Sequence, residues 1–442
     1  MRSLPFALAA LPLVLSAPVQ ATPQEGSGVA WEITEGLTTE VGPRMAGTDR
    51  EAAARDWAKE RLTRLGFTNV KVEPFPIRGF VRGDDHARLT APVPQPLAIT
   101  ALGYSAATPA KGIEAELVYF PTLDALKAAP QGSLKGKIAF VDHAMRANQD
   151  GSGYGPYGNV RRQAPAIASA KGAAGVVIRS IGTDSHRNPH TGGTNFGKAS
   201  PIPAGAVSNP DADLIARLAG RGQPLRIAMT LTSHPQDNMP SGNVIADLPG
   251  SDPSLPMILL ACHLDSWDLG TGAIDDASGC GIITEAALAA HKAGNLRTIR
   301  VLWAGSEELG GYGGGAYAKA HADEAHAVAM ESDFGADRVW AVRTNFAGTP
   351  LAARINAALN PLGIVPQEGE TEGGTDVGAI IAAQKLAVVD LAQDGTRYFD
   401  LHHTPDDTLD KVDPAQLAQN VAAWTAVLGI LANEAGPITR AQ

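Results

Sequence analysis

Apolar and polar positions follow two different periods in the first part of the chain, and the two periods separate a helix from a strand. Residues 50–67, REAAARDWAKERLTRLGF, place their apolar side chains at helical spacing, and the pattern stops at Gly66. Residues 68–77, TNVKVEPFPI, then alternate like a half-buried strand. This segment therefore predicts a helix that is followed directly by a strand.

The pattern changes between Gly103 and about Pro240. Three short apolar runs, KGKIAFVDH, AAGVVIRS and PIPAGAVS, are separated by glycine and proline, and residues 164–172 predict a small helix between two of them. Residues 190–197, HTGGTNFG, are typical of a flexible solvent loop, although exported hydrolases use such loops as lids. We expect residues 104–237 to form an inserted α+β domain.

Strands and helices alternate from residue 241 onward. The runs PMILLACH, TIRVLWAG, AVAMESD and LAVVDLA predict strands, and SGCGIITEAALAAHKAG, GGAYAKAHADEA and TPLAARINAALNPLG predict helices. This alternation indicates an α/β fold, in which a mostly parallel sheet is flanked by helices. We expect residues 22–103 and 238–442 to form one discontinuous catalytic domain around this sheet.

Residues 1–21 have the three regions of a secretory signal peptide. Arg2 is followed by an apolar run over 4–15 and by the small-residue pattern Val19-Gln20-Ala21. No later stretch is apolar for long enough to span a bilayer. We therefore expect an exported protein, periplasmic or secreted, that has no membrane partner once the signal is removed.

Composition and charge exclude some classes of partner. The 442 residues are 44% hydrophobic and 19% charged, which is typical of an ordered globular protein. With 36 basic against 46 acidic residues, the net charge of −10 argues against nucleic acid as a partner. The two cysteines, Cys262 and Cys280, rule out a disulfide scaffold. Export would permit one bridge between them, but two buried thiols are the preferred interpretation.

Histidines and carboxylates occur where four of the predicted strands end. They are His263, Asp275, Glu307, Glu308, Asp333 and His403. Ligands of α/β sheets bind beyond the carboxyl ends of the strands, so these side chains are expected on one rim. Two histidines and three carboxylates suit two divalent ions, with zinc as the first choice. One carboxylate must then bridge, and Asp275 is the candidate because its glycine-rich loop lets it turn inward.

The remaining acids need separate roles. We expect Glu308 to be a metal ligand and Glu307 to be the general base. Two ions about 3.5–4 Å apart can share one water. Glu307 would take a proton from this water and pass it to the leaving amine. Asp265 lies two residues after His263 and points to the same side if the strand continues. It is expected to accept the ring N–H of His263, the alternative being an exposed acid or a helix cap.

The motifs HLDSWD, GAIDDASG, SEELGGYG, MESD and HHTPDDT, in this order, resemble the co-catalytic dizinc aminopeptidase and glutamate carboxypeptidase superfamily. Within it the likeness is to the carboxypeptidase Q-like branch, and it extends to GPRMAGT, NPHTGGT and EGGTDVG. The resemblance implies a phosphorylase/hydrolase-like catalytic domain and a protease-associated insert. It also implies unblocked dipeptides as substrates and a homodimer.

The resemblance also distributes the ligands. It assigns His263, Asp275 and Asp333 to one ion, and Asp275, Glu308 and His403 to the other. His402 stands where other branches of the superfamily carry tyrosine, and we expect it to hydrogen-bond the oxyanion or the substrate carboxylate. The alternative for His402 is a structural role against its loop, and Tyr398 is a weaker candidate for lining the same pocket.

Several rival functions lack their motifs. The sequence contains no G-x-S-x-G nucleophile elbow and no H-E-x-x-H zinc helix. The histidines of HADEAH, residues 321–326, are five apart, so they lie about 140° apart around a helix. The sequence thus favours a zinc exopeptidase of small peptides, most directly unblocked dipeptides. An aminopeptidase of longer peptides, a single-zinc glutaminyl cyclase and a non-catalytic binding relative remain as alternatives.

Overall fold

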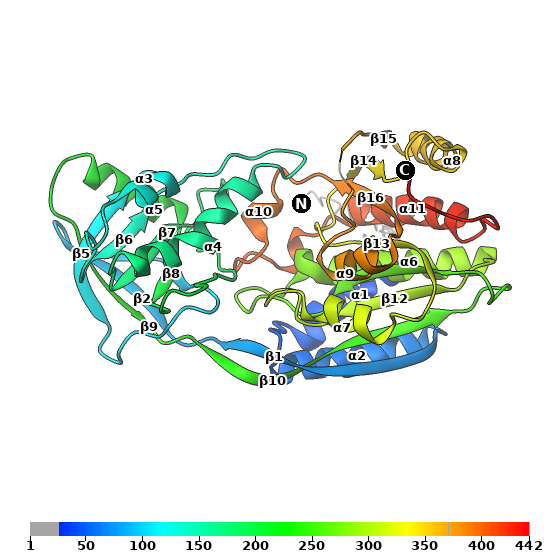
Figure 1. Cartoon of the computed structure of the whole chain (residues 1–442), viewed down its shortest axis with the longest axis horizontal. Coiled ribbons are helices and arrows are strands. Elements are labelled where there is room, and N and C mark those ends of the chain that lie inside the picture. Colours follow the sequence, from blue (N-terminus) through cyan, green and yellow to red (C-terminus); the bar gives the residue numbers. More distant parts are fainter. Residues whose placement is uncertain (1–25, 370, 442) are drawn as a thin grey trace, which may run out of the picture.

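The computed structural model describes residues 26–369 and 371–441, so the signal peptide predicted at residues 1–21 lies outside the described residues. Within these ranges the chain forms two units side by side, each built on an eight-stranded sheet (Figure 1). None of the described helices combines the length and the apolar composition needed to cross a bilayer.

The larger sheet contains the strands predicted from residue 241 onward. In spatial order its strands are β1 (Thr68–Val81), β10 (His234–Leu248), β12 (Ile299–Ala304), β11 (Met257–His263), β13 (His326–Glu331), β16 (Ala387–Gln393), β14 (Val339–Thr344) and β15 (Val365–Pro366). The four central strands β12, β11, β13 and β16 are parallel, whereas β1 and β10 pair antiparallel at one side and β14 pairs antiparallel with β16. The predicted α/β class with a mostly parallel central sheet is confirmed.

Helices cover both faces of this sheet because its central strands are apolar at nearly every position. Ile258, Leu260 and Cys262 belong to the larger core, together with residues of α6 (Ser278–Ala293), α11 (Pro414–Leu431) and α1 (Val29–Gly36). The intervening Leu259 and Ala261 belong to a second core with α7 (Tyr312–Ala320) and α9 (Thr375–Gln384). Alternate side chains thus face opposite layers, as the pleat requires. The helices α2 (Asp49–Arg64) and α8 (Pro350–Leu359) pack at the margins.

The smaller unit corresponds to the predicted insert. Its strands, in spatial order, are β3 (Gln95–Leu97), β2 (Asp85–Ala91), β9 (Arg226–Leu231), β5 (Ile113–Phe120), β6 (Ile138–Val141), β7 (Gly175–Arg179), β8 (Ala204–Val207) and β4 (Ile99–Ala101). The helices α3 (Leu123–Ala128), α4 (Tyr154–Ala170) and α5 (Asn209–Ala219) accompany it. The sequence pattern predicts the first boundary at residue 103, but β2, β3 and β4 lie before that residue and pair within this smaller sheet.

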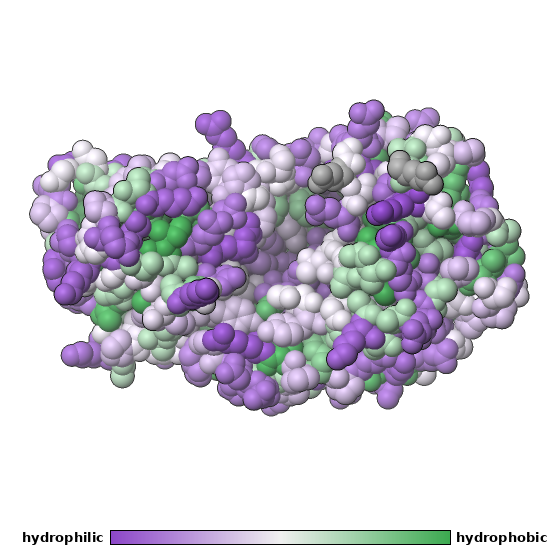
Figure 2. All heavy atoms as spheres, in the orientation of Figure 1, coloured by the Kyte–Doolittle hydropathy of each residue, from purple (hydrophilic) through white to green (hydrophobic). Residues whose placement is uncertain are grey.

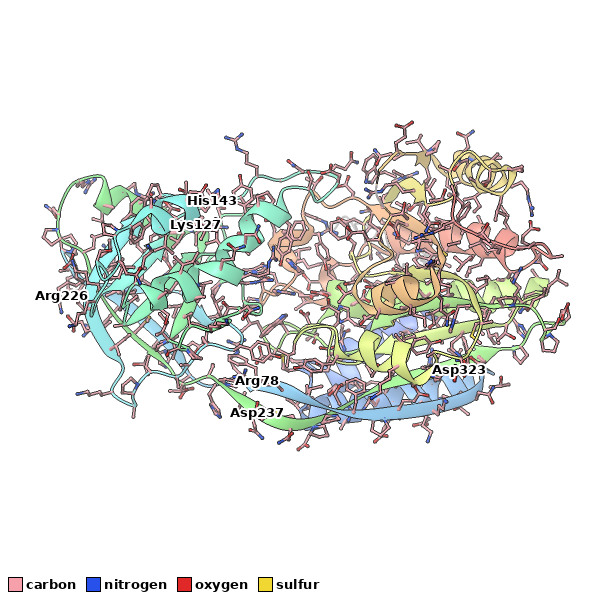
Figure 3. The ribbon with its side chains drawn as sticks, in the orientation of Figure 1. Arg78, Lys127, His143, Arg226, Asp237 and Asp323 are labelled. Atoms are coloured by element: carbon pink, nitrogen blue, oxygen red, sulfur yellow. A yellow bond between two sulfur atoms is a disulfide. The ribbon has the colours of Figure 1, made fainter. Side chains whose placement is uncertain are left out.

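The connection between the units is a long antiparallel ribbon. Strands β1 and β10 stay paired from Thr68 opposite Asp247 to Val81 opposite His234. Arg78 and Asp237, which are labelled in Figure 3, lie on the part of this ribbon that leaves the larger unit, and Nε of Arg78 is 3.4 Å from a carboxylate oxygen of Asp237. The short helix α10 (Tyr398–Leu401) also lies between the units (Figure 1). Single helical turns occur at Leu37–Val41, Asn360–Leu362 and Leu409–Lys411. The turn Ala273–Ala277 is not helical throughout, because Asp275 and Asp276 have non-helical backbone angles.

Helix α4 is longer than the sequence predicts. The expected helix covers residues 164–172, but α4 begins ten residues earlier, at Tyr154. Glycine and proline in GYGPYGN read as helix breakers, and Pro165 lies inside the helix. Val160, Ala164 and Ala168 bury the inner face against the insert core. This tertiary packing outweighs the unfavourable local propensity.

The two cysteines form a disulfide between the end of β11 and the first turn of α6. Cys262 and Cys280 are fully buried, and their Cα atoms are 5.1 Å apart. The preferred interpretation as two thiols is therefore wrong. The loop of residues 264–277 folds back over the strand end, and this proximity in space cannot be seen in the spacing of the cysteines.

Candidate metal centre

Five of the six side chains expected on the rim converge around Asp275. His263 is the last residue of β11, and Asp275 lies in the turn Ala273–Ala277 before α6. Glu308 follows β12, Asp333 follows β13, and His403 follows α10. The carboxyl ends of parallel strands meet at one edge of a sheet, which explains why residues so far apart in sequence lie together.

Asp275 is the centre of this group because its two oxygens face different partners. Oδ1 lies 2.8 Å from Nε2 of His263, and that nitrogen lies 3.2 Å from Oδ1 of Asp333. Oδ2 of Asp275 lies 3.2 Å from Nε2 of His403, and that nitrogen lies 2.9 Å from Oε2 of Glu308. The arrangement therefore has two halves that share one carboxylate.

Two of the quoted motifs hold the Asp275 loop in place. In HHTPDDT, the Asp407 carboxylate accepts the backbone N–H groups of Ile274 and Asp275, at 2.6 and 3.2 Å. In GPRMAGT, the fully buried Arg44 donates to the carbonyl oxygens of Thr271 and Gly272, at 2.6 and 2.8 Å. Because Gly272 has a positive φ of 61°, the loop can turn inward at that point.

The electrostatics of the site favour a bound cation. Burial and the charge of Asp275 raise the pKa of Glu308 to about 8, and burial raises the pKa of Asp265 to about 6. One oxygen of Glu308 has no hydrogen-bond partner among the described residues. Buried carboxylates this close destabilise each other unless positive charge lies among them. Two imidazoles and three carboxylates are a donor set suited to borderline divalent metals, so these residues fit a metal centre.

Asp265 acts differently from the sequence prediction. The Nδ1 atom of His263 is 3.0 Å from the backbone carbonyl oxygen of Asp265, whereas the nearest carboxylate oxygen is 3.8 Å away. The chain leaves the strand conformation after His263, so the carbonyl, not the side chain, faces the ring. The carboxylate instead accepts the backbone N–H groups of Glu307 and Glu308, at 3.0 and 3.3 Å.

Glu307 lies beside the centre and lines the same cleft. Its pKa is raised by burial and by the negative charge of Asp333, and the hydroxyl of Thr375, at the start of α9, hydrogen-bonds its side chain. The structure thus places a carboxyl side chain next to the five converging side chains. Glu307 is held there by the contact of its own backbone N–H with Asp265.

His402 and Tyr398 form part of an aromatic stack on the cleft wall. The Tyr398 ring stacks on His402 with a centroid distance of 4.6 Å, and the His402 ring is 4.2 Å from that of His403. His402 is buried, and its Nδ1 atom has no hydrogen-bond partner within residues 26–369 and 371–441. Burial, together with the neighbouring His403, holds the pKa of His402 well below its usual value. Both effects favour the neutral form of the ring.

The insert supplies side chains that the sequence analysis did not single out. His190 and Thr191 are 1% and 0% exposed, and the His190 ring lies 4.7 Å from that of His402. The expectation of a solvent loop at residues 190–197 is therefore wrong for its first three residues, whereas Asn195 and Gly197 are exposed. Arg161 and Arg162 of α4 also line the cleft. The one sequence signal for this contribution is the motif NPHTGGT, which belongs to the resemblance.

The cleft itself lies between the two units. It has a volume of about 880 Å³, and Figure 2 shows the recess at the middle of the molecule. Its lining includes Asp275, Glu307 and His403 from the larger unit, and Tyr154 and residues 193–197 from the insert. A molecule that fills this cleft beside the converging side chains therefore contacts both units.

Comparison with known proteins identifies both units. The profile of peptidase family M28 matches residues 243–428, and that of the PA domain matches residues 113–215. Carboxypeptidase Q from Bos taurus is 31% identical over 407 residues, which cover 90% of this chain and 84% of the relative. Carboxypeptidase Q from Homo sapiens matches with the same identity and coverage.

Solved structures agree with this relationship. The crystal structure of a peptidase M28 precursor from Shewanella amazonensis SB2B is similar with a TM-score of 0.90 and 43% identity, and covers 95% of this chain and 96% of that one. An aminopeptidase from Aneurinibacillus sp. strain AM-1 shares the fold, with a TM-score of 0.63, 21% identity, and coverage of 93% and 95%. The chain therefore belongs to peptidase family M28, as a metallopeptidase of the carboxypeptidase Q-like type with a PA domain insert.

Proposed function

We propose that the chain is a two-zinc exopeptidase that hydrolyses short peptides with free ends, and unblocked dipeptides above all. The observation that carries the proposal is the division of Asp275 between two halves of the site, with one oxygen toward His263 and the other toward His403. A single ion would leave one half of this arrangement without a cation. A bridging carboxylate is what two closely spaced divalent ions require.

The five side chains divide into two ligand sets. His263, Asp275 and Asp333 hold one ion, and Asp275, Glu308 and His403 hold the other. Zinc is the metal of choice because imidazole and carboxylate ligands with an open position suit its catalytic sites. When bound, the pair of ions lowers the pKa of water and polarises the carbonyl of the scissile bond.

Glu307 moves the proton in the proposed reaction. Its carboxylate takes a proton from the attacking water and delivers it to the nitrogen of the leaving amine. A base works best when its pKa approaches the working pH, and the raised pKa of Glu307 is in that direction. Asp265 keeps Glu307 in place by accepting its backbone N–H. Asp265 is thus a positioning residue.

His402 supplies a hydrogen-bond donor without a charge. A neutral imidazole can donate an N–H to the oxygen on which negative charge develops, and such donors are most effective where water is excluded. The burial of His402, its place on the cleft wall and its unpartnered ring nitrogen support this role. Tyr398 holds the ring of His402 by stacking.

Selection for a free carboxylate is proposed to reside in Arg162. The side chain lines the same cleft as the acidic centre, from the side of the insert. Its Nη2 atom donates to the carbonyl of Gly155 and to Asn159, and its guanidinium lies 5.9 Å from the centroid of the Tyr154 ring. Arginine forms paired hydrogen bonds with a carboxylate, so the charge and geometry suit the end of a short peptide.

Export is part of the proposal. It is supported by the signal pattern at residues 1–21 and by a disulfide in the described part of the chain, since disulfides persist in oxidising compartments. Fractionation of the native source, with detection of the chain by antibody, tests it. Recovery of the full-length chain from the cytosol alone would contradict export.

A substrate panel tests the proposed activity. The purified, zinc-loaded chain is given one dipeptide in four forms: free, N-acetylated, C-amidated, and extended by two residues. We expect hydrolysis of the free dipeptide and loss of activity with either block. Failure of the acetylated form alone indicates an aminopeptidase. Cyclisation of an N-terminal glutamine without hydrolysis, or no turnover of any peptide, contradicts the proposal.

A further inference from the structure

We propose that the insert forms part of the metal centre: Arg161 and the backbone of Thr191 fix the orientation of His403 and so set the affinity for the ion that His403 holds. The inference rests on the proposed function, in which His403 is a metal ligand. It adds two positioning residues that belong to the PA domain and not to the peptidase domain.

The first observation is a two-way backbone contact between the units. The N–H of Thr191 donates to the carbonyl oxygen of His403 at 3.0 Å. The carbonyl oxygen of Thr191 lies 3.4 Å from Nδ1 of the His403 ring. A ring nitrogen that holds a metal ion carries no proton, so with Nε2 as the ligand beside Asp275 and Glu308, Nδ1 would carry the proton and the Thr191 carbonyl would accept it. Nη1 of Arg161 also lies 3.4 Å from Nδ1. A histidine ligand is normally oriented by such a partner on its second nitrogen.

The second observation is that Arg161 holds this acceptor in place. Its Nη1 atom donates to the carbonyl of Thr191 at 3.1 Å, and its Nη2 atom donates to the hydroxyl of Tyr154 at 2.7 Å. The side chain is 6% exposed. A Cβ at Gly192 would lie 2.1 Å from Nη1, so the loop is shaped closely around the guanidinium. The position of the Thr191 carbonyl therefore depends on Arg161.

The third observation is the backbone of His403, which has a positive φ of 59°. A residue with a side chain persists in this left-handed region only where its surroundings hold it. The hydrogen bond from Thr191 to the His403 carbonyl is one of those restraints. Loosening the Thr191 loop would thus free both the backbone and the ring of the ligand.

The two halves of the metal centre differ in this respect. The ring of His263 is oriented by the carbonyl of Asp265, two residues further along the larger unit. The ring of His403 is oriented from the insert. A change in the insert should therefore weaken the binding of the ion at His403 and leave the binding of the ion at His263 unaffected. A general loss of protein stability would not produce that difference.

The experiment measures zinc affinity without substrate. The wild-type chain and the variants Arg161→Met, Arg161→Lys and Arg217→Met are stripped of metal and titrated with zinc against a chromogenic chelator. In Arg161→Met we expect one equivalent to bind at least about 10-fold more weakly and the other to keep its Kd. Arg161→Lys should recover part of the loss, because it restores a cationic donor. Arg217→Met, which changes an exposed arginine on α5 of the same insert, should change neither Kd.

A milder variant guards against misfolding. Tyr154→Phe removes only the hydroxyl that accepts from Arg161, and we expect a smaller loss at the same single equivalent. Suppose that the wild-type chain binds two equivalents of zinc, and that Arg161→Met and Tyr154→Phe leave both affinities unchanged or weaken them equally. This result would overturn the inference and leave the proposed function intact. A wild-type chain that binds fewer than two equivalents would overturn the two-ion function itself.

Discussion

The geometry of the metal centre depends on the two carboxylate oxygens of Asp275, one of which faces His263 and the other His403. The rim position of the ligands could be predicted from the sequence, because each follows a predicted strand of a parallel sheet. The role of Asp265 could not, since it depends on where the backbone turns after His263. The contribution of Thr191 was also hidden, because its partner His403 is 212 residues away and in the other unit.

Glu307 provides the sharpest prediction at the residue scale. Glu307→Gln keeps the size and the backbone contact with Asp265 but removes the proton acceptor. We expect kcat on a dipeptide to fall by at least about 100-fold, with two zinc ions still bound, because general base catalysis contributes on this order. Kinetics together with zinc analysis of the same sample provide the measurement. Near wild-type kcat in the fully loaded variant would show that another group moves the proton.

At the scale of elements, periodicity located the four central parallel strands of the larger unit and the helices α2, α6, α7 and α8. The elements β10, β14, α9 and α11 were not predicted, and glycine and proline concealed the start of a further helix. The start of α4 was missed because glycine and proline precede Val160, and packing against the insert core holds the helix. Strands β2 to β4 were assigned to the wrong side of the boundary, because strand pairing is not visible in a local pattern. The disulfide was missed for the same reason.

The disulfide should stabilise the larger unit next to His263. It closes a loop with a sequence separation of 18 between β11 and α6. Replacing both cysteines, as Cys262→Ala with Cys280→Ala, should lower the free energy of unfolding by about 3 kcal/mol, mainly through the freedom gained by the unfolded chain. Denaturant unfolding of the metal-free double variant beside the wild type measures this. Equal stability of the two proteins would show that the bridge adds nothing.

The contact between α7 and β1 should make stability depend on pH. His321, after α7, lies 3.0 Å from the Glu73 carboxylate on β1, with Arg300 and Glu324 also facing its ring. The hydrogen bond from His321 lowers the pKa of Glu73 from 4.5 to about 2, and the contact with Glu73 raises the pKa of His321 above 6.5. The contribution of Glu73 to the free energy of unfolding is therefore present above pH 4.5 and is lost as the pH falls toward 2. The His321 contribution is present below pH 6.5 and is lost as the pH rises through its raised pKa.

The Glu73→Gln variant tests this window. Its Tm should fall furthest below that of the wild type between pH 4.5 and 6.5, and the difference should shrink at pH 9. Glu116→Gln, which removes an exposed surface pair with Lys137, is the control and should show little change at any of these pH values. A Glu73→Gln difference that stays constant across the range would contradict the assignment.

At the scale of the whole molecule, the cleft joins two units into one site. The peptidase unit supplies the converging ligands and Glu307, and the insert supplies the opposite wall and the contacts to His403. The ribbon of β1 and β10 and the stack of Tyr154 on Phe399 keep the two walls together. The sequence separates the two units but does not indicate that they share a site.

The most direct test of this arrangement is anomalous diffraction at the zinc edge from a crystal of the zinc-loaded chain. We expect two peaks per chain about 3.5–4 Å apart, one next to His263 and Asp333, the other next to Glu308 and His403, with Asp275 between them. A single peak at full zinc saturation, or a second peak that Asp275 does not touch, would contradict the shared-carboxylate centre.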